Sequence, residues 1–287
     1  MNIDNSNFIL KPKNDYVFKK IFGDERNKDI LIAFLKAILK IDIKDVQILN
    51  SELPKENIAD KKSILDIRAT IDNNVEIDVE IQVARTIYMP QRSLYYWSKM
   101  FESQLTEGQK YDTLAKTICI NILNFRCLKT KEAHSIYRLK EVNTNEELTD
   151  LQEIHFIELP KLPKNEEIKD VFDAWMEFIE NPISNKLEKA EMNIQEIKEA
   201  KNELLRLSAS DKERMKYEDR RAALLDKVSA LENAEEKGIE IGKEIGKKEG
   251  EQNKAIEVAK NLIEAGVDIE IIIKSTGLER VEIEKLL

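Results

Sequence analysis

The chain has 287 residues, which is enough for one α/β domain with an appended region and too many for a single small core. Charged residues make up 35% of it, and glycine and proline number only 8 and 6, so the composition excludes a disordered protein and favours a soluble, helix-rich one. The formal net charge of −9 argues weakly against nucleic acid as a partner. Metal sites need carboxylates whatever they act on, so charge alone does not decide the partner.

The two cysteines, Cys119 and Cys127, offer no disulfide framework, and their spacing matches no zinc motif. The first ten residues lack the basic and apolar regions of a secretory signal. No apolar run reaches the roughly 18 residues that suggest a membrane span. We therefore expect a protein of the reducing cytoplasm that has no membrane partner.

Two helices are predicted within residues 11–40. Apolar residues recur at helical spacing over 18–22 and again over 30–38, and Gly23 interrupts the pattern between them. Asp15 stands just before the first helix, and we interpret it as the N-cap of that helix.

A β-hairpin follows and is the clearest pattern in the sequence. Residues 64–71 alternate apolar and polar side chains, Asp72-Asn73-Asn74 supplies turn chemistry, and residues 75–83 alternate again without a break. Residues 46–53 are expected to form a further strand before the hairpin.

A helix over 89–106 and a short buried strand over 116–125 are predicted after the hairpin. The order of elements is then α-β-β-β-α-β, ending near residue 125. Residues 154–160 are strand-like and are predicted to extend the same sheet.

From about residue 165 the sequence becomes helical in character. Residues 171–179 are apolar on one side, and residues 184–235 consist mainly of Lys, Glu, Ala and Leu without a glycine. The change divides the chain into three predicted parts, an α/β domain over 1–164, a helical region over 165–236 and a C-terminal segment over 237–287.

Glycine occupies every fourth position from 238 to 250, which places four glycines on one drifting stripe of a helix. Each glycine costs about 1 kcal/mol of helix stability relative to alanine. One interpretation is close approach of a second helix, and hence self-association, most simply as a dimer; the other is a low-complexity spacer. Residues 268–287 outline two short helices, and the acidic second one favours a hairpin that packs on a partner over a DNA-reading helix.

Acidic side chains gather on one face of the predicted hairpin. Its second strand places Glu76, Asp78, Glu80 and Gln82 on the face expected to meet solvent, opposite Asp66 on the first strand. Residues i and i+2 of a strand point the same way and lie roughly 6–7 Å apart, so Asp66, Glu80 and Gln82 can reach one small volume. The solvated face of an ordinary hairpin explains the same pattern, and spacing alone favours that explanation, with Asp78 simply solvated.

Two converging carboxylates repel each other unless a cation lies between them. All-oxygen ligands suit Mg²⁺ or Mn²⁺ rather than zinc, and neither His134 nor His155 falls near the motif. Such an ion polarises a phosphoryl oxygen and lowers the pKa of a bound water, as phosphodiester hydrolysis requires. Asp66 and Glu80 would then be ligands, and Gln82 would orient the water or contact the phosphate.

The sequence resembles a known group of nucleases. Asp66, then thirteen residues, then Glu80-Ile81-Gln82, set in an αβββαβ order, is the pattern of the PD-(D/E)xK superfamily. The surrounding residues are similar to the Rpn family, the recombination-promoting nucleases or putative transposases of bacteria. The resemblance covers roughly residues 11–160 and continues more loosely through 207–220 and the glycine stripe. Its motifs are KNDYVFKKIFG (13–23), NSELPKE (50–56), KKSILDIRATI (61–71), QRSLYYWSKMFESQLTEGQKY (91–111) and ICINILNF (118–125).

The resemblance implies a restriction-endonuclease-like core whose metal ligands are Asp66 and Glu80, with Glu52 as a weaker candidate. Gln82 becomes the third signature residue. In the wider superfamily this position is a lysine that supports the attacking hydroxide, whereas the Rpn family has glutamine there.

The positive charge of that lysine must then come from elsewhere. The candidates are Lys13, Lys19 and Arg85. Arg92, on the helix after the hairpin, is in a position to meet a phosphate.

The implied activity is a Mg²⁺-dependent DNA endonuclease, with Mn²⁺ or Ca²⁺ as alternative ions. The implied setting is DNA breakage in recombination, in mobile elements or in defence against phage. The alternative hypothesis is a non-catalytic DNA- or protein-binding module on the same fold, with its activity lost or held off by the helical tail.

Overall fold

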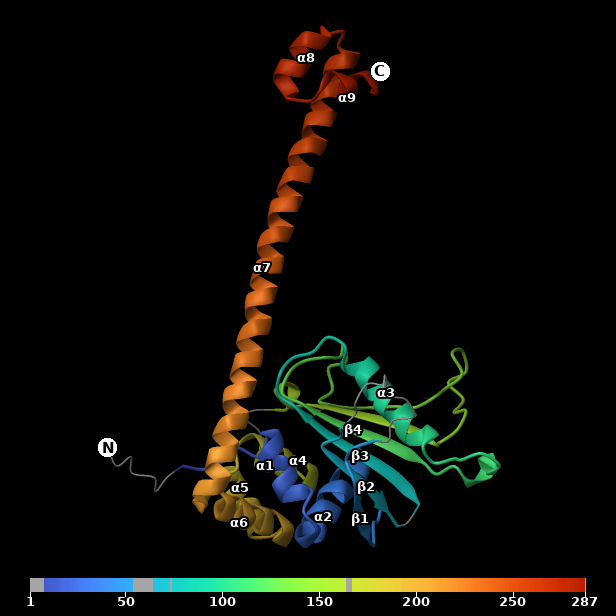
Figure 1. The fold of residues 1–287 in the computed structure, drawn as a ribbon, viewed down its shortest axis with the longest axis vertical. Coiled ribbons are helices and arrows are strands. Elements are labelled where there is room, and N and C mark those ends of the chain that lie inside the picture. The colour runs from blue at the N-terminus through green and yellow to red at the C-terminus, as the bar shows by residue number, and fades with distance from the viewer. Residues whose placement is uncertain (1–7, 54–63, 73, 164–166, 287) are drawn as a thin grey trace, which may run out of the picture. The chain divides into compact units, whose positions relative to one another are not determined.

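The structure is a computed structural model that describes residues 8–53, 64–72, 74–163 and 167–286 (Figure 1). The chain divides into two units, residues 1–225 and 226–287. Among the described residues, none of the helices is both long and apolar enough to cross a membrane.

A six-stranded mixed sheet forms the centre of the first unit, with the order β1-β2-β3-β4-β6-β5. The first three strands are antiparallel neighbours, β3, β4 and β6 run parallel, and β5 closes one edge antiparallel to β6. The strands are β1 (Val46–Leu49), β2 (Ile67–Ile71), β3 (Val75–Gln82), β4 (Thr117–Leu123), β5 (His134–Tyr137) and β6 (Gln152–Glu158). β4 and β6 are buried throughout, as expected of parallel strands that are covered on both faces.

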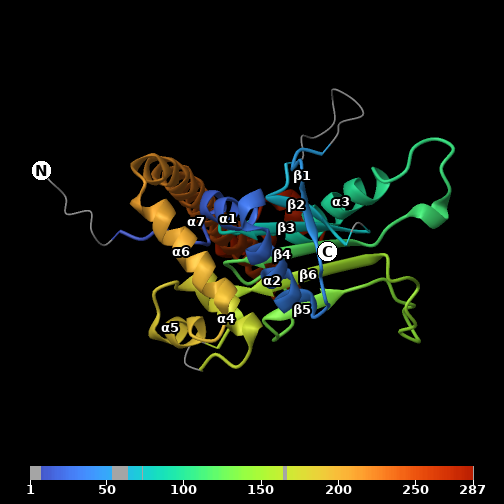
Figure 2. The ribbon, with the colours of Figure 1, turned by 90° about the horizontal axis from the view of Figure 1, so that it is seen from below.

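Helices cover both faces of this sheet. α1 (Asp15–Phe22) and α2 (Lys28–Leu39) pack on one face, and α3 (Met89–Glu102) packs on the other (Figure 2). Because side chains alternate along a strand, β4 and β6 contribute to two separate cores, one under each set of helices. The buried apolar side chains of β1, β2 and β3 all belong to the core under α1 and α2.

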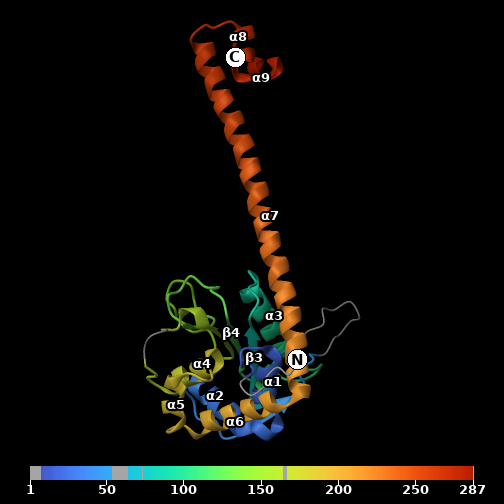
Figure 3. The ribbon, with the colours of Figure 1, turned by 90° about the vertical axis from the view of Figure 1, so that its left-hand side faces the viewer.

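Three further helices complete the first core. α4 (Val171–Glu180), α5 (Asn185–Glu191) and α6 (Gln195–Ala209) gather around α2, as Figure 3 shows. The described residues also form single 3-10 turns in connections, at η2 (Glu25–Asn27), η3 (Tyr111–Thr113) and η4 (Leu159–Lys161).

The long helix α7 (Asp211–Glu264) begins in the first unit and ends in the second. In the second unit its last turns pack with α8 (Ile269–Thr276) and α9 (Arg280–Glu284) around a small core of Ala259, Ile272, Leu278 and Ile283. The predicted pair of short helices at the C-terminus is therefore present, with the end of α7 as its packing surface. The boundary between the two units, after residue 225, differs from the predicted boundaries after 164 and 236. The division of the chain into three parts stays a prediction.

The predicted αβββαβ order and the added strand near residue 154 are confirmed. Two local predictions are wrong. The first helix is capped by Asn14, whose side chain accepts the amide of Tyr16, while Asp15 is already in the first turn. The strand expected over 46–53 ends at Leu49. Strand β5 could not be predicted, because its four residues, His-Ser-Ile-Tyr, do not alternate clearly between apolar and polar side chains.

The hairpin turn also joins the strands beside it. Asp72 adopts a left-handed φ of 48°, which Asp tolerates in turns, and the neighbouring Asn73 lies outside the described residues. The Asp72 carboxylate accepts the amides of Lys44 and Asp45 at 2.9 and 3.0 Å, so the turn anchors the start of β1.

An aromatic cluster holds α1, α2 and α4 together in the first core. Phe22 lies between Phe34 and Trp175, with ring centroids 4.5 and 5.6 Å away, and all three side chains are fully buried. Such edge and tilted contacts add to the free energy gained by burying the rings.

We expect Phe34→Ala to lower the free energy of unfolding by about 3–5 kcal/mol, because it removes a buried ring and leaves a cavity in a packed core. Urea unfolding followed by circular dichroism measures the change. Val142→Ala, at a side chain that is 90% exposed, is the control and should change stability by less than about 0.5 kcal/mol. A loss below about 1 kcal/mol in Phe34→Ala would contradict the cluster's role.

Candidate active site

Asp66 and Glu80 are held together by hydrogen bonds from the backbone amides of Asp66 and Ile81 to their side chains. Ile67 pairs with Val79 across the β2–β3 ladder, so Asp66, just before β2, lies opposite Glu80. The Asp66 amide donates to Glu80 Oε1 at 2.9 Å, and the Ile81 amide donates to Asp66 Oδ2 at 3.0 Å. The hairpin register thus fixes the two carboxylates side by side.

Arg92 of α3 meets the same site from above the sheet. Its Nη2 donates to Glu80 Oε2 at 2.7 Å, and its Nη1 donates to Gln82 Oε1 at 3.0 Å. The guanidinium also lies over the ring of Tyr96, 5.1 Å from its centroid. The Gln82 amide is fixed at its other end, because Nε2 donates to the carbonyl of Ala84 at 3.2 Å.

A second cation reaches the acidic pair from the opposite side. Lys19 of α1 places its Nζ 2.9 Å from Asp66 Oδ1. The site therefore contains two carboxylates and two side-chain cations, and each cation is paired with a different carboxylate.

The other predicted residues lie in different surroundings. Lys13 pairs with Glu180 of α4 at 3.1 Å, and Arg85 is exposed in the loop after β3. Glu52 is exposed at an isolated bridge between its backbone and Ile64. The structure thus brings Lys19 and Arg92 to the predicted trio and places Lys13 in a separate ion pair.

The prediction that the acidic face of the hairpin meets solvent is wrong. Glu80 and Asp78 are each only 1% exposed. The cause is α3, whose Met89, Tyr96 and Met100 cover this face and form the second core with the strands. The signal in the sequence was the apolar spacing of the helix that follows the hairpin, because its apolar side must be buried against the sheet.

Burial and repulsion change the ionisation of this face. Burial and the Asp66 charge raise the pKa of Glu80 from 4.5 to about 7, against the opposing influence of Arg92. Burial, together with Glu80 and Asp66, raises the pKa of Asp78 well above its usual range. Asp78 Oδ1 is buried without a hydrogen-bond partner, and burial also raises the pKa of the neighbouring Cys119 thiol.

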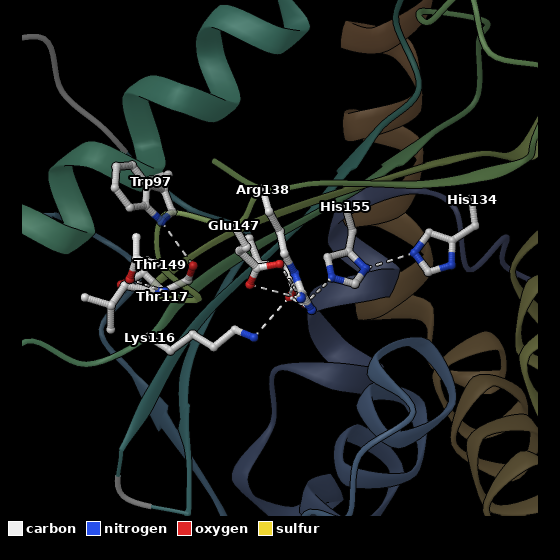
Figure 4. Close-up of polar contacts among 10 residues, drawn as sticks. Trp97, Lys116, Thr117, His134, Arg138, Glu147, Thr149 and His155 are labelled. Atoms are coloured by element: carbon white, nitrogen blue, oxygen red, sulfur yellow. Dashed lines mark hydrogen bonds and ion pairs between the residues drawn. The ribbon is translucent and has the colours of Figure 1, made fainter. Parts of the chain in front are cut away.

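The histidines belong to a separate polar network, shown in Figure 4. His155 Nε2 lies 2.7 Å from Glu153 Oε1, and its Nδ1 lies 2.9 Å from His134 Nε2. Glu153 also pairs with Lys116 and Arg138, and although burial favours its neutral form, the hydrogen bonds from His155 and Lys116 bring its pKa down to about 2. This network joins the edge strand β5 to β6 and includes no residue of the predicted trio.

The acidic pair suits a hard divalent cation. Among the described residues no group of three or more His, Cys, Asp or Glu side chains could hold a metal alone. Mg²⁺ does not need such a group, because it is usually bound by one or two carboxylates together with water and substrate phosphates. Asp66 and Glu80 are the residues that would hold such an ion, and in this structure they form ion pairs with Lys19 and Arg92.

The comparison with known families agrees with this geometry. The model of the PD-(D/E)XK nuclease family transposases matches residues 12–234. The chain belongs to this family. No curated protein and no solved structure matches it.

Membership confirms the predicted resemblance and the restriction-endonuclease-like α/β core. It also supports a nuclease-like or transposase-associated function for the chain. The match extends past residue 164, in accordance with the packing of α4 and α6 against α2 and of α5 against α4 and α6. The contact of Arg92 with both Glu80 and Gln82 could not be predicted from the sequence, since it depends on how α3 lies over β3.

We expect Asp66→Asn to lower the pKa of Glu80 below about 7, because the substitution removes the repelling charge, while burial, the larger cause, keeps it above 4.5. The Glu80 carboxyl carbon, assigned through Glu80→Gln, can be titrated by ¹³C NMR in chelator-treated protein. Asp112→Asn, in an exposed turn, is the matched control.

The same shift has a consequence for stability. Because the folded-state pKa of Glu80 is raised, its contribution to stability is complete below about pH 4.5 and is lost as the pH rises through about 7.

For the titration of the Asp66→Asn variant, an unchanged Glu80 pKa would show that the charge of Asp66 does not act on Glu80.

Proposed function

We propose that this chain is a metal-dependent DNA endonuclease that hydrolyses phosphodiester bonds, with Mg²⁺ as the resident ion and Mn²⁺ or Ca²⁺ as alternatives. The observation that carries the proposal is the close pair of Asp66 and Glu80, which the hairpin holds together against their repulsion. A fold does not need such a pair for stability, since burying two like charges is costly. Membership of a nuclease family supports the same assignment.

Asp66 and Glu80 would hold the ion, which supplies charge neutralisation at the phosphoryl group and activation of water. The chain's own residues do the positioning. The Ile81 and Asp66 amides orient the two carboxylates, and Glu80, with its pKa of about 7, changes ionisation near neutral pH.

The cellular setting belongs to the same proposal. We infer DNA breakage in the bacterial cytoplasm, in recombination, in mobile elements or in phage defence. The transposase description of the family supports the first two settings, and the two free cysteines, Cys119 and Cys127, fit a reducing compartment.

We expect Asp66→Ala and Glu80→Ala each to lower the cleavage of supercoiled DNA in Mg²⁺ or Mn²⁺ by about 100-fold or more, the scale of losing one electrostatic stabiliser. Gel assays measure the nicked and linear products, and circular dichroism checks the fold. Glu107→Ala, at an exposed acid of a distant loop, is the control and should cut as the wild type does. Cleavage at the wild-type rate by both site variants would remove the assignment.

A second candidate function is a non-catalytic binding module on the same fold. It is favoured by the fact that all four oxygens of the acidic pair already accept a hydrogen bond or an ion pair. Calorimetry separates the two candidates. Titration with Mg²⁺ or Mn²⁺ gives heat that Asp66→Ala removes if the chain is a nuclease, and gives none if Lys19 and Arg92 permanently replace the metal.

Besides DNA, we propose that the chain binds a second copy of itself through the C-terminal helices. Gly238, Gly242, Gly246 and Gly250 lie within α7, and an added Cβ at each would meet nothing within 4 Å. Ile241 and Ile245 beside them are more than half exposed, so the chain presents small and apolar residues together. A second copy of α7 packed on this stripe would account for both.

We expect the double variant Gly242→Ala/Gly246→Ala to weaken the dimer while raising the melting temperature of the helix, since each alanine adds about 1 kcal/mol of helix stability and one methyl group of bulk. Sedimentation equilibrium and circular dichroism measure the two effects. Lys237→Ala is the control, because it adds helix propensity outside the stripe. A wild-type chain that sediments as a monomer would leave the glycines as a spacer.

A further inference from the structure

The side chain of Gln82 is held at both ends. Its Oε1 accepts from Arg92 Nη1 at 3.0 Å, and its Nε2 donates to the Ala84 carbonyl at 3.2 Å. The amide hydrogens are thus directed to the backbone of the same strand, and the acceptor oxygen is directed to an arginine. Gln82 carries no charge, so what it contributes to the site is the placement of Arg92.

Arg92 spans the two motif residues with a single guanidinium. Glu80 Oε2 and Gln82 Oε1 each accept from a different terminal nitrogen, which leaves further N–H groups of the five on the guanidinium. Nε is buried and has no hydrogen-bond partner, while the side chain as a whole keeps 34% exposure. The planar fork of donors matches the oxygens of a phosphate, and its charge does not depend on pH.

The surroundings keep the guanidinium at this position. Tyr96, one helical turn further along α3, lies beneath it, with its ring centroid 5.1 Å from the guanidinium carbon. Because α3 is anchored in the second core through Met89 and Met100, the arginine is fixed by packing as well as by charge.

The other cations are less suited to this position. Lys13 is paired with Glu180, and Arg85 is exposed in the loop after β3. Lys19 is within the site, but its ion pair is with Asp66 and not with Glu80 or Gln82. Arg92 is the cation whose contacts include the third residue of the motif.

We propose that Arg92 contacts the phosphate of the DNA strand at the acidic pair, and that Gln82 is a positioning residue that holds Arg92 there. The positive charge that meets the phosphate then comes from helix α3 and not from strand β3. The phosphate contact rests on the proposed function for its substrate class, but it requires only that DNA binds at this site.

The first test measures DNA binding by the full chain in EDTA, where no cleavage occurs. Fluorescence anisotropy with a labelled duplex gives the affinity at several KCl concentrations. Arg92→Gln should reduce the slope of log affinity against log salt by about one, the change for one lost phosphate contact. The transposed variant Gln82→Lys/Arg92→Gln returns a charge to the same place and should restore the slope. Arg206→Gln, which breaks a comparable Arg–Glu pair on α6, is the matched control.

The second test measures cleavage by the same proteins. Arg92→Gln should lower the single-turnover rate by about 100-fold, and the transposed variant should recover at least about tenfold of that loss. Arg92→Lys keeps the charge without the fork and should fall between the two. Gln82→Ala leaves the arginine present but not held, so kcat should fall more than KM rises.

The outcomes separate this inference from the nuclease assignment. An Arg92→Gln chain with an unchanged salt slope overturns the phosphate contact. A loss of cleavage that Gln82→Lys does not rescue, in a folded protein, also overturns it, because Arg92 would then only support Glu80. A wild-type chain that binds DNA with an Arg92-dependent slope but never cuts supports the contact while the nuclease proposal fails.

Discussion

The central constraint in this structure is that two acidic side chains lie close together in a largely buried site. Glu80 accepts the amide of Asp66 and Asp66 accepts the amide of Ile81, so these hydrogen bonds tie the two side chains together at the end of the β2–β3 ladder. Their repulsion is answered by cations from two helices, Lys19 of α1 and Arg92 of α3. The helices on both faces of the sheet are thereby tied to the same pair of carboxylates.

This arrangement explains why the site lies where it does. β3 is the strand at which the antiparallel part of the sheet meets the parallel part, so one of its edges pairs with β2 and the other with β4. The hairpin provides Asp66 and Glu80, and helix α3, which covers this face of the sheet, provides Arg92. Two acids on an edge strand would be solvated on one side, so burial would not raise their pKa.

Much of the fold followed from local patterns in the sequence. Alternation over 64–83 predicted a hairpin, and the apolar run over 116–125 predicted a buried strand. Both patterns are local, because they reflect whether one face or both faces of a strand are buried. The short strand β5 had no such pattern, since its partly exposed residues do not line a core. The N-cap was misplaced by one residue, because Asn14 and Asp15 both carry an oxygen suited to capping and only the backbone geometry decides between them.

The sequence by itself determined that Asp66, Glu80 and Gln82 would share one small volume, because the period of a strand and the register of a hairpin are local properties. It also carried the pattern that places the chain in its family. Only the tertiary structure decided that Glu80 and Asp78 are buried rather than solvated, and that Arg92 completes the site. Those features depend on how α3 lies across the sheet, and the packing of a helix on distant strands is set by the shapes of two surfaces that no short segment of sequence contains.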